Sequence, residues 1–402
     1  MIRPAYVVER FPERSQTFVQ NELRALPGVG VSPRVFALYP HSDLDGEASD
    51  LAFRRLPTST HHLGRLFRAV SRLAVRRPRG LARAAVLAAR RPSKFQIHCL
   101  AKAVFLAEEL LADPPPWLHA HFARASASTS MLASAILAVP FTFTAHGADL
   151  FYEPFDVDRK IHRAAVTVTV CQYNRRWMQA RWTAPDVIVV PCGVDHRRFT
   201  RSSPYPGVVP FNILAVGRLV PKKGFSDLVA ACSILRDRGV AFNCVIAGGG
   251  PLEATLRTQI DSNHLGDRVQ LLSSIPGHKI KVLLESASVF CLPAVVASDG
   301  DRDSQPVVLK EAMAMSVPVV ATNEVGIPEL VDAAVGVLVP PGDQMALADA
   351  LGALEGSQNA VLAQLGRTGR ARILDGFTLE TQVMRLTAAW RSAGLYPDQP
   401  NV

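Results

Sequence analysis

The segment from Ser298 to Pro318, SDGDRDSQPVVLKEAMAMSVP, joins a polar loop to a short apolar helix. Two carboxylates, Asp303 and Glu311, are eight positions apart in it. Glu311 falls in the first or second turn of the expected helix and Asp303 precedes it, so both can converge on one polyhydroxylated ligand. The exposed amides and the dipole of a helix start also favour a phosphate. The segment therefore predicts a site for a sugar nucleotide.

Short β-branched runs alternate with helical patterns on both sides of this segment. The runs are PAYVV (4–8), RVFAL (34–38), WLHAHF (117–122), PFTFTA (140–145), VTVTV (166–170), VIVVP (187–191), FNILAVG (211–217), NCVIAG (243–248), VQLL (269–272), SVFCLP (288–293), VPVVAT (317–322) and GVLVP (336–340). Such alternation predicts an α/β protein with parallel sheets flanked by helices.

The length of 402 residues suggests two domains. Residues 195–210, DHRRFTRSSPYPGVVP, are rich in Ser, Pro and Arg and have no periodicity, so we expect them to be the linker. A last helical pattern spans about 379–393, and spacing alone does not fix where it packs.

The composition fits a globular protein, with 48% hydrophobic and 20% charged residues. No run approaches the length of a membrane span, and the first residues lack an export signal. We expect a cytoplasmic protein or one held peripherally at the inner face of the cell membrane. The six cysteines show no ligand spacing and are typical of buried thiols.

The net charge of +9 is concentrated, because no Asp or Glu occurs from Leu51 through Ala107. Within this region residues 63–74 show helical spacing of apolar side chains with arginines between them. The apolar positions are Leu63, Leu66, Phe67, Val70, Leu73 and Ala74, and the arginines are Arg65, Arg68 and Arg72. Two interpretations stay open: a solvated helix packed on its own domain, and an anionic membrane surface as partner of residues 63–91. Nucleic acid is not expected, because aromatic residues for base stacking are not interleaved.

Two turns of the second half follow predicted strands. The first carries Gly217, Arg218, Lys222 and Lys223, and such cations suit a diphosphate, although solvated surface cations would look the same. The second turn contains three glycines, which permit a close backbone approach but are weak evidence alone. These are Gly248, Gly249 and Gly250.

Histidines mark the strand ends of the first half. His119 and His121 lie in LHAHF, and His146 is followed by Gly147 and Asp149 at a strand-to-helix junction. His146 is the strongest candidate for a ligand contact, because Gly147 leaves room beside it. A third metal ligand with recognisable spacing is absent from the sequence, so we expect no metal.

Taken in order, these segments resemble the retaining glycosyltransferases of family 4. The segments that carry the resemblance are RFPERSQTFVQNEL (10–23), FTAHGADLF (143–151), VPCGVD (190–195), AVGRLVPKKG (215–224), IAGGGP (246–251), the Asp303–Glu311 segment and GIPELV (326–331). The first of these and DGDRD (299–303) are most similar to bacterial members of the colanic-acid and exopolysaccharide kind.

The resemblance implies the GT-B fold, with two Rossmann-like parallel-sheet domains facing each other across a cleft. Residues 1–200 would then form an acceptor-binding domain and residues 201–377 a nucleotide-sugar-binding domain, with the helix at 378–402 packing back on the first. It implies a nucleotide-diphosphate sugar as co-substrate, a carbohydrate or lipid-linked acceptor, and neither metal nor other cofactor.

The resemblance also implies roles for single residues. Arg218 and Lys223 would bind the donor diphosphate, Glu311 the ribose and Asp303 the donor sugar, while His146 would face that sugar. We expect Gly217, Gly248, Gly249, Gly250 and Ser304 to complete the donor site, and Ser15, Thr17, His119, His121 and Asp149 to lie on the acceptor side.

Two positions depart from the family pattern. Asp303 stands where a Glu is usual and Ser304 where a Gly is usual. Because Asp is one methylene shorter, we expect an altered choice of donor sugar, with loss of activity as the alternative. The glycine-rich loop that many relatives carry after the first strand is replaced here by residues 9–17.

The function expected from the sequence is therefore a metal-independent, retaining hexosyltransferase, which forms surface polysaccharide from a nucleotide sugar. One alternative is the glycosylation of a small natural product such as an aminocyclitol antibiotic. Another is a non-catalytic sugar-nucleotide-binding subunit of a polysaccharide complex.

Overall fold

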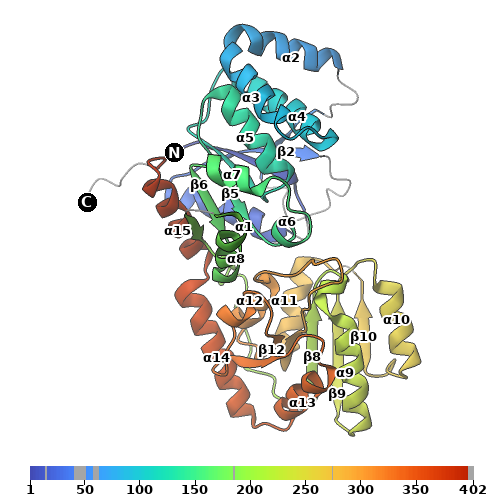
Figure 1. Ribbon diagram of the computed structural model, residues 1–402. Coiled ribbons are helices and arrows are strands. Elements are labelled where there is room, and N and C mark those ends of the chain that lie inside the picture. The colour runs from blue at the N-terminus through green and yellow to red at the C-terminus, as the bar shows by residue number, and fades with distance from the viewer. Residues whose placement is uncertain (14–15, 40–50, 58–62, 184–185, 274, 397–402) are drawn as a thin grey trace, which may run out of the picture. The chain divides into compact units, whose positions relative to one another are not determined.

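The computed structural model describes residues 1–402 apart from 14–15, 40–50, 58–62, 184–185, 274 and 397–402 (Figure 1). The chain forms two compact units. The first comprises residues 1–170, 174–191 and 382–402, and the second comprises 171–173 and 192–381.

The first unit is built on a seven-stranded sheet in the order β3-β2-β1-β4-β5-β6-β7, with every neighbouring pair parallel. The strands are β1 (Ala5–Arg10), β2 (Arg34–Tyr39), β3 (Phe53–Arg55), β4 (Leu118–His121), β5 (Phe141–Ala145), β6 (Val166–Thr169) and β7 (Val187–Val189). The sequence analysis missed β3, a three-residue edge strand with two arginines, because exposed edge strands are short and charged.

Successive side chains of these strands point to opposite faces of the sheet. In β1, Ala5 and Val7 join one apolar cluster with the helices α2 (Leu63–Arg76), α3 (Pro78–Ala89), α4 (Lys94–Leu110) and α5 (Ala125–Leu137), which gather together in Figure 1. Tyr6 and Val8 join a second cluster on the other face, together with Trp390 and other side chains of α1 (Thr17–Ala25) and α15 (Leu379–Ser392).

The helices of the first unit are α1 (Thr17–Ala25), α2 (Leu63–Arg76), α3 (Pro78–Ala89), α4 (Lys94–Leu110), α5 (Ala125–Leu137), α6 (Ala148–Phe151), α7 (Val157–Arg163), α8 (Gln172–Trp182) and α15 (Leu379–Ser392). The first two residues of α8 belong to the second unit, and most of α15 lies in the first unit. The expected helix over 63–74 is confirmed as α2. Trp390 of α15 is fully buried and lies 5.1 Å from the ring of Trp117, so the end of the chain completes the core of this unit.

The second unit contains a six-stranded parallel sheet in the order β10-β9-β8-β11-β12-β13. Its strands are β8 (Phe211–Val216), β9 (Phe242–Ala247), β10 (Val269–Leu272), β11 (Val289–Leu292), β12 (Val319–Thr322) and β13 (Gly336–Val339). Its helices are α9 (Phe225–Asp237), α10 (Glu253–Ser262), α11 (Gly277–Ser286), α12 (Val307–Ala314), α13 (Gln344–Glu355) and α14 (Asn359–Gly376).

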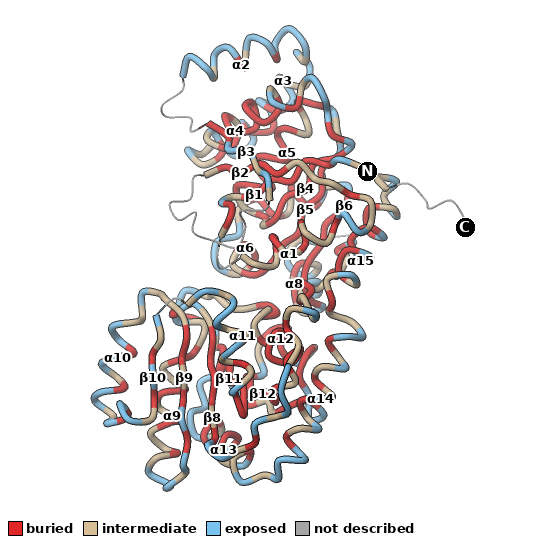
Figure 2. The backbone as a smooth tube through the Cα atoms, turned by 180° about the vertical axis from the view of Figure 1, so that it is seen from behind, coloured by how far each residue is buried: buried red, intermediate tan, exposed pale blue. Residues whose placement is uncertain are grey.

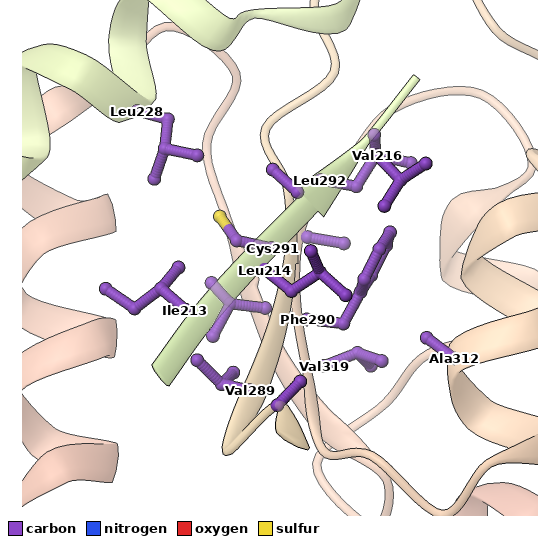
Figure 3. Close-up of a cluster of buried hydrophobic side chains, with 14 of the residues drawn as sticks. Ile213, Leu214, Val216, Leu228, Val289, Phe290, Cys291, Leu292, Ala312 and Val319 are labelled. Atoms are coloured by element: carbon purple, nitrogen blue, oxygen red, sulfur yellow. The ribbon is translucent and has the colours of Figure 1, made fainter. Parts of the chain in front are cut away.

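The central strands β8 and β11 are buried on both faces, as expected for near-continuous apolar runs. Figure 3 shows their side chains, including Leu214, Phe290 and Cys291, packed toward Leu228 of α9 and Ala312 of α12. All six cysteines are buried free thiols, as predicted. The α/β class with two Rossmann-like parallel sheets is confirmed.

Residues 195–210 differ from the expected linker, because they pack on the second unit. Phe199 is buried in its core, and the Arg201 guanidinium donates to the carbonyl oxygens of Met315, Leu284 and Glu285. Apart from residues 171–173, the second unit thus begins at Cys192. Polar composition alone could not reveal this packing, since Arg201 acts through backbone acceptors that are distant in the sequence.

Candidate functional site

The strand orders place one switch point in each unit, where ligands of open parallel sheets bind beyond the carboxyl ends of the strands. It lies between β1 and β4 in the first unit and between β8 and β11 in the second. Of the predicted site residues, His121 ends β4, Gly217, Arg218 and Lys223 follow β8, and Asp303 and Ser304 lie between β11 and α12.

The turn after β8 is held in place by backbone contacts. The amide of Leu219 donates to the Gly249 carbonyl at 2.9 Å, and Gly224 has a φ of +65°. A Cβ on Gly224 would lie 1.8 Å from the carbonyl oxygen of Pro293, so the turn packs directly on the loop after β11. The cations of this turn therefore face the loop that carries the carboxylates.

Lys222, Lys223, Asp301 and Asp303 form an ion-pair cluster at this point. Lys223 Nζ lies 2.6 Å from Asp303 Oδ2, while Lys222 Nζ lies 3.0 Å from Asp301 and 3.6 Å from Asp303. Burial acts to raise the pKa of Asp303, but the two lysines hold that pKa below its usual value. Lys223 and Asp303 were predicted separately from the sequence, and their direct contact was not predicted.

Arg218 differs from the two lysines. It is exposed, and among the residues that the structure describes it makes no ion pair. A guanidinium with five donors on the rim of the turn is suited to a phosphate group.

Glu311 lies in the second turn of α12 and is 8% exposed. The preceding loop is fixed through Ser304, whose carbonyl accepts from the Gly326 amide at 2.9 Å. A Cβ on Gly326 would come within 2.7 Å of that oxygen, so the GIPELV segment supports the loop. Ser304 itself is buried.

The glycine turn after β9 has a structural explanation. A Cβ on Gly248 would lie 1.9 Å from the Gly217 carbonyl oxygen, and one on Gly250 would lie 2.5 Å from that of Leu219. Gly248 and Gly250 therefore let two backbone turns pack together. The close approach seen here is to protein backbone.

In the first unit, Glu22, His119, His121 and His146 form what we call the histidine cluster. His121 Nδ1 lies 3.1 Å from His146 Nε2, and His121 Nε2 lies 3.1 Å from Glu22 Oε1. The Tyr6 hydroxyl donates to Glu22 Oε1 at 3.0 Å. The structure thus brings His121 and His146 into direct contact, as their places at the ends of β4 and β5 allow.

His146 is enclosed by aromatic rings. The centroids of Phe18 and Phe122 each lie 4.6 Å from the His146 ring. Phe122 adopts a φ of +72°, which is uncommon for a bulky residue and found mostly at functional sites. Burial, and secondly the neighbouring His121, lower the pKa of His146 well below its usual value, so the ring is neutral near pH 7.

Asp149 is fully buried and accepts backbone hydrogen bonds from Ala123 at 2.7 Å, Gly147 at 2.8 Å and His146 at 3.0 Å. Burial raises the pKa of Asp149 although these bonds oppose the shift. Its carboxylate fixes the loops after β4 and β5.

The remaining acceptor-side predictions are placed differently. His119 has no exposed surface and contacts the hydroxyls of Thr142 at 2.7 Å and Thr144 at 3.3 Å, so it lies in the core. Thr17 begins α1 and is partly exposed. Ser15 lies outside the described residues.

Among the residues described, Glu22, His119 and His121 are the group whose ligand atoms could hold a metal, lying within 4.8 Å of one another. Each of the three already has hydrogen-bond partners within the cluster or on β5. These partners would have to be displaced by an ion, so the donor set does not fit a resident metal.

Glu22 and Glu9 were not predicted as site residues from the sequence. Phe18 and Glu22 are four positions apart and therefore share one face of α1, a signal that could have linked them to the histidines. Glu9, near the end of β1, accepts from the Ala125 amide at 2.9 Å at the start of α5. Burial raises the pKa of Glu9.

Two family models match this chain: "Glycosyltransferase Family 4" over residues 15–198 and "Glycosyl transferases group 1" over residues 208–372. The putative colanic acid biosynthesis glycosyltransferase WcaL of Salmonella typhimurium is 31% identical, covering 94% of this chain and 96% of that protein. The amylovoran biosynthesis glycosyltransferase AmsK of Erwinia amylovora is 29% identical, covering 84% and 87% respectively.

Solved structures are similar over almost the whole chain. Sucrose-phosphate synthase from Thermosynechococcus elongatus has a TM-score of 0.72 at 17% identity, covering 98% of this chain and 99% of its own. Anabaena HepE in complex with UDP-glucose has a TM-score of 0.72 at 16% identity, covering 98% and 100%. At such identities the likeness concerns the fold.

Proposed function

Because this chain belongs to the family 4, group 1 glycosyltransferases and has their GT-B fold, we propose that it forms a cell-surface polysaccharide. It would transfer a hexose from a nucleotide-diphosphate sugar to a hydroxyl of a carbohydrate or lipid-linked intermediate, with retention of configuration. The observation that carries the proposal is the ion-pair cluster at the switch point of the second unit. The names of the relatives support the choice of polysaccharide over a small natural product.

In this proposal the diphosphate lies against Arg218 and Lys223. Arg218 supplies a fork of N–H donors, and Lys223 is held ready by its contact with Asp303. When the diphosphate binds, Lys223 is shared between a phosphate oxygen and Asp303. Asp303 then retains Lys222 at 3.6 Å and keeps its charge balanced.

Glu311 would hold the ribose and Asp303 a hydroxyl of the donor sugar. The acceptor hydroxyl attacks the anomeric carbon from the face on which the diphosphate leaves. The leaving phosphate oxygen takes the acceptor proton, so the protein needs no nucleophile of its own. Arg218 and Lys223 offset the negative charge that develops on the leaving group, without a metal ion.

The contact proposed for His146 is a hydroxyl of the donor sugar. The neutral ring of His146 can exchange hydrogen bonds with a hydroxyl, whereas a carboxylate could only accept. Thr17, at the start of α1, would lie on the acceptor side.

The experiment that tests this function is a nucleotide-release screen of the purified chain with uridine-, guanosine- and adenosine-linked sugar diphosphates. Release from one donor would support the transferase and identify the sugar. No release from any donor, even after polysaccharide intermediates are added as acceptors, would overturn it. A shift in melting temperature with a nucleotide would in that case support the non-catalytic binding subunit.

We also propose an anionic membrane surface as partner of the first unit. No helix among the described residues is long and apolar enough to span a membrane. Instead α2 carries an exposed stripe of Leu63 (73%), Phe67 (73%) and Val75 (79%), and Figure 2 shows α2 exposed along most of its length. Such a helix can lie in the headgroup region with its apolar side chains inserted.

The arginines of this region divide into two groups. Arg65 pairs with Glu109 at 3.2 Å and Arg72 with Glu108 at 2.8 Å, around a cavity of about 480 Å³ that Arg68 also lines. Arg68, Arg76, Arg79, Arg83 and Arg90 are exposed and have no ion pair among the described residues. This second group offers uncompensated charge to phosphate headgroups.

The matched test follows from this division. Replacing Arg68, Arg76 and Arg79 by Gln should weaken sedimentation with vesicles of phosphatidylglycerol and phosphatidylcholine, because each cation near an anionic surface contributes about 1 kcal/mol. Arg65→Gln with Arg72→Gln removes the paired arginines and should leave sedimentation largely unchanged. Equal sedimentation of the two variants with these vesicles would refute the membrane proposal.

A further inference from the structure

The ion-pair cluster of the second unit alternates in sign from one side chain to the next. Lys223 Nζ contacts Asp303 Oδ2 at 2.6 Å, and Lys222 Nζ lies 3.6 Å from Oδ1 of the same carboxylate. Lys222 Nζ also contacts Asp301 Oδ1 at 3.0 Å. The two lysines therefore reach different oxygens of Asp303, and Lys222 lies between two carboxylates, closer to Asp301.

The backbone on both sides of the cluster is fixed. The Lys222 carbonyl accepts from the Val295 amide at 2.9 Å, and the Asp301 carbonyl accepts from the Ala297 amide at 2.9 Å. The Asp301 amide donates to the Asp299 side chain at 3.0 Å. Lys222 is 12% exposed and Asp301 17%, so solvent screens their charges little. A change of partner within the cluster therefore needs a movement of side chains and not of the two loops.

We propose that Lys222 is a positioning residue that passes from Asp301 to Asp303 when the donor binds. The exchange takes place as Lys223 turns to the diphosphate. This inference rests on the proposed function, which assigns the diphosphate to Arg218 and Lys223. It adds that Asp301 restrains donor binding, because it holds Lys222 back from Asp303. Before the donor arrives, Lys223 is then the nearer cation for Asp303.

The charges of the cluster explain why an exchange is needed. Without the donor, two lysines balance two carboxylates. When Lys223 binds the diphosphate, Asp303 loses its nearest cation beside a ligand that is itself negative. Low exposure to solvent and a nearby anion both disfavour an ionised carboxylate, so Asp303 must gain another cation or take up a proton. Lys222, at 3.6 Å, is the cation within reach.

The other charges near Asp303 leave this assignment intact. Burial acts to raise the pKa of Asp303, and the charges that lower it are those of Lys223 and Lys222. Arg302, next to Asp303 in the sequence, acts on Glu324 at the end of β12. Burial raises the pKa of Glu324, and Arg302 opposes this shift.

The first experiment needs no turnover and uses inorganic diphosphate as the probe. The aspartates carry ¹³C in their carboxyl groups, and Asp303 is assigned by the loss of its signal in Asp303→Asn. With the probe at saturation, Asp303 of the unaltered chain should stay ionised from pH 7.5 to 5.0. In Lys222→Met, Asp303 should take up a proton within this range, because one lysine then serves both the carboxylate and the diphosphate. The same titration in both chains would overturn the exchange.

The second experiment measures the KM for the donor that the release screen identifies. Lys222→Met should raise this KM at least fivefold, because Lys223 would leave Asp303 without a replacement. Lys222→Arg keeps a cation and should bring the KM to within threefold of the unaltered chain.

Asp301→Asn should change the KM in the opposite direction. It releases Lys222 toward Asp303 and thereby frees Lys223 for the diphosphate, so the KM should fall at least threefold. A role of the cluster in folding alone predicts a loss of function in both variants. An unchanged or raised KM in Asp301→Asn would refute the restraint.

Asp299→Asn is the matched control, because it removes an exposed carboxylate outside the cluster and keeps an acceptor oxygen for the Asp301 amide. Its KM should stay within 1.5-fold of the unaltered chain, and a fall equal to that of Asp301→Asn would refute the exchange. The two possible failures are distinguishable. Lack of turnover with every donor would refute the proposed function, whereas equal titration of Asp303 with and without Lys222 would refute the exchange alone.

Discussion

The two units use the same kind of parallel sheet but place their charges in opposite ways. In the first unit, ionisable side chains are buried beneath the strand ends. These are Glu22, Lys102, His119, His121, His146, Asp149, Asp156 and Lys160. In the second unit four charges of the candidate site, Lys222, Lys223, Asp301 and Asp303, lie on loops at the rim and pair with one another, whereas Glu311 is buried on α12.

The pKa shifts of the two units have different main causes. In the first unit burial is the main cause, and it lowers the pKa of both Lys102 and Lys160 to about 8. In the second unit the pKa of Asp303 falls despite burial, because two cations outweigh it. We therefore expect substitutions in the first unit to act mainly on stability and those at the rim of the second mainly on activity.

The largest expected effect is on turnover in the second unit. Arg218→Ala should lower kcat by about 100- to 1,000-fold, the scale on which one preorganised charge stabilises a transition state. Its melting temperature should stay within about 1 °C, because the exposed Arg218 makes no ion pair among the described residues. Lys279→Ala, which removes another exposed cation of this unit, is the control. A large loss of stability in Arg218→Ala would contradict the division between the units.

Asp149→Ala tests the opposite expectation in the first unit. It leaves three backbone amides without an acceptor and should cost about 3 kcal/mol of unfolding free energy, at about 1 kcal/mol for each bond. Asp343→Ala, which removes an exposed helix cap from the second unit, should cost about 1 kcal/mol. Urea unfolding measures both changes.

Tryptophan fluorescence makes the urea-unfolding measurement specific to the first unit. All four tryptophans, Trp117, Trp177, Trp182 and Trp390, belong to the first unit. Asp149→Ala should thus shift the fluorescence transition, whereas Asp343→Ala should appear in circular dichroism alone. Equal shifts of the fluorescence transition would contradict this prediction.

A third prediction concerns acid. His119 and His146 have pKa values below 6.5 in the folded chain, so the unfolded chain binds their protons more readily. Stability should be fully present above pH 6.5 and fall as the pH drops below it, by about 1.4 kcal/mol per pH unit for each proton. Fluorescence-detected unfolding between pH 7.5 and 5.5 measures the slope of the unfolding free energy against pH. His119→Gln should reduce this slope by the contribution of one proton. An unchanged slope would count against the buried neutral state of His119.

The smallest effect is expected for Asp303→Glu. The longer side chain restores the family residue next to Lys223 and should change the relative rates with different nucleotide sugars by several-fold. Asp267→Glu makes the same change at an exposed position. It should leave the ratios of the rates with different nucleotide sugars unchanged. Identical ratios in both variants would show that Asp303 does not select the sugar.

The periodicity of short sequence segments was sufficient to predict the strands and the fold class of this molecule. All twelve predicted strands are present, and Asp303 and Glu311 lie on the loop and helix expected for them. The histidine cluster could be predicted only in part, because Glu22 meets His121 across 99 positions and Gln382 across 360. Spacing in a sequence reports neighbours within one helix or strand, and these contacts depend on the assembled sheet. For the same reason the backbone packing of Gly248 against Gly217 could not be distinguished from a ligand loop.

The return of α15 to the first unit has a consequence for the order of events during synthesis. Trp390 and Gln382 are synthesised after residues 192–381, yet they contribute to the core around Trp117 and to the hydrogen bonds of Glu22. Residues 192–381, which hold the whole second sheet, emerge earlier. During synthesis, residues 192–381 can therefore fold before α15 packs on the amino-terminal sheet.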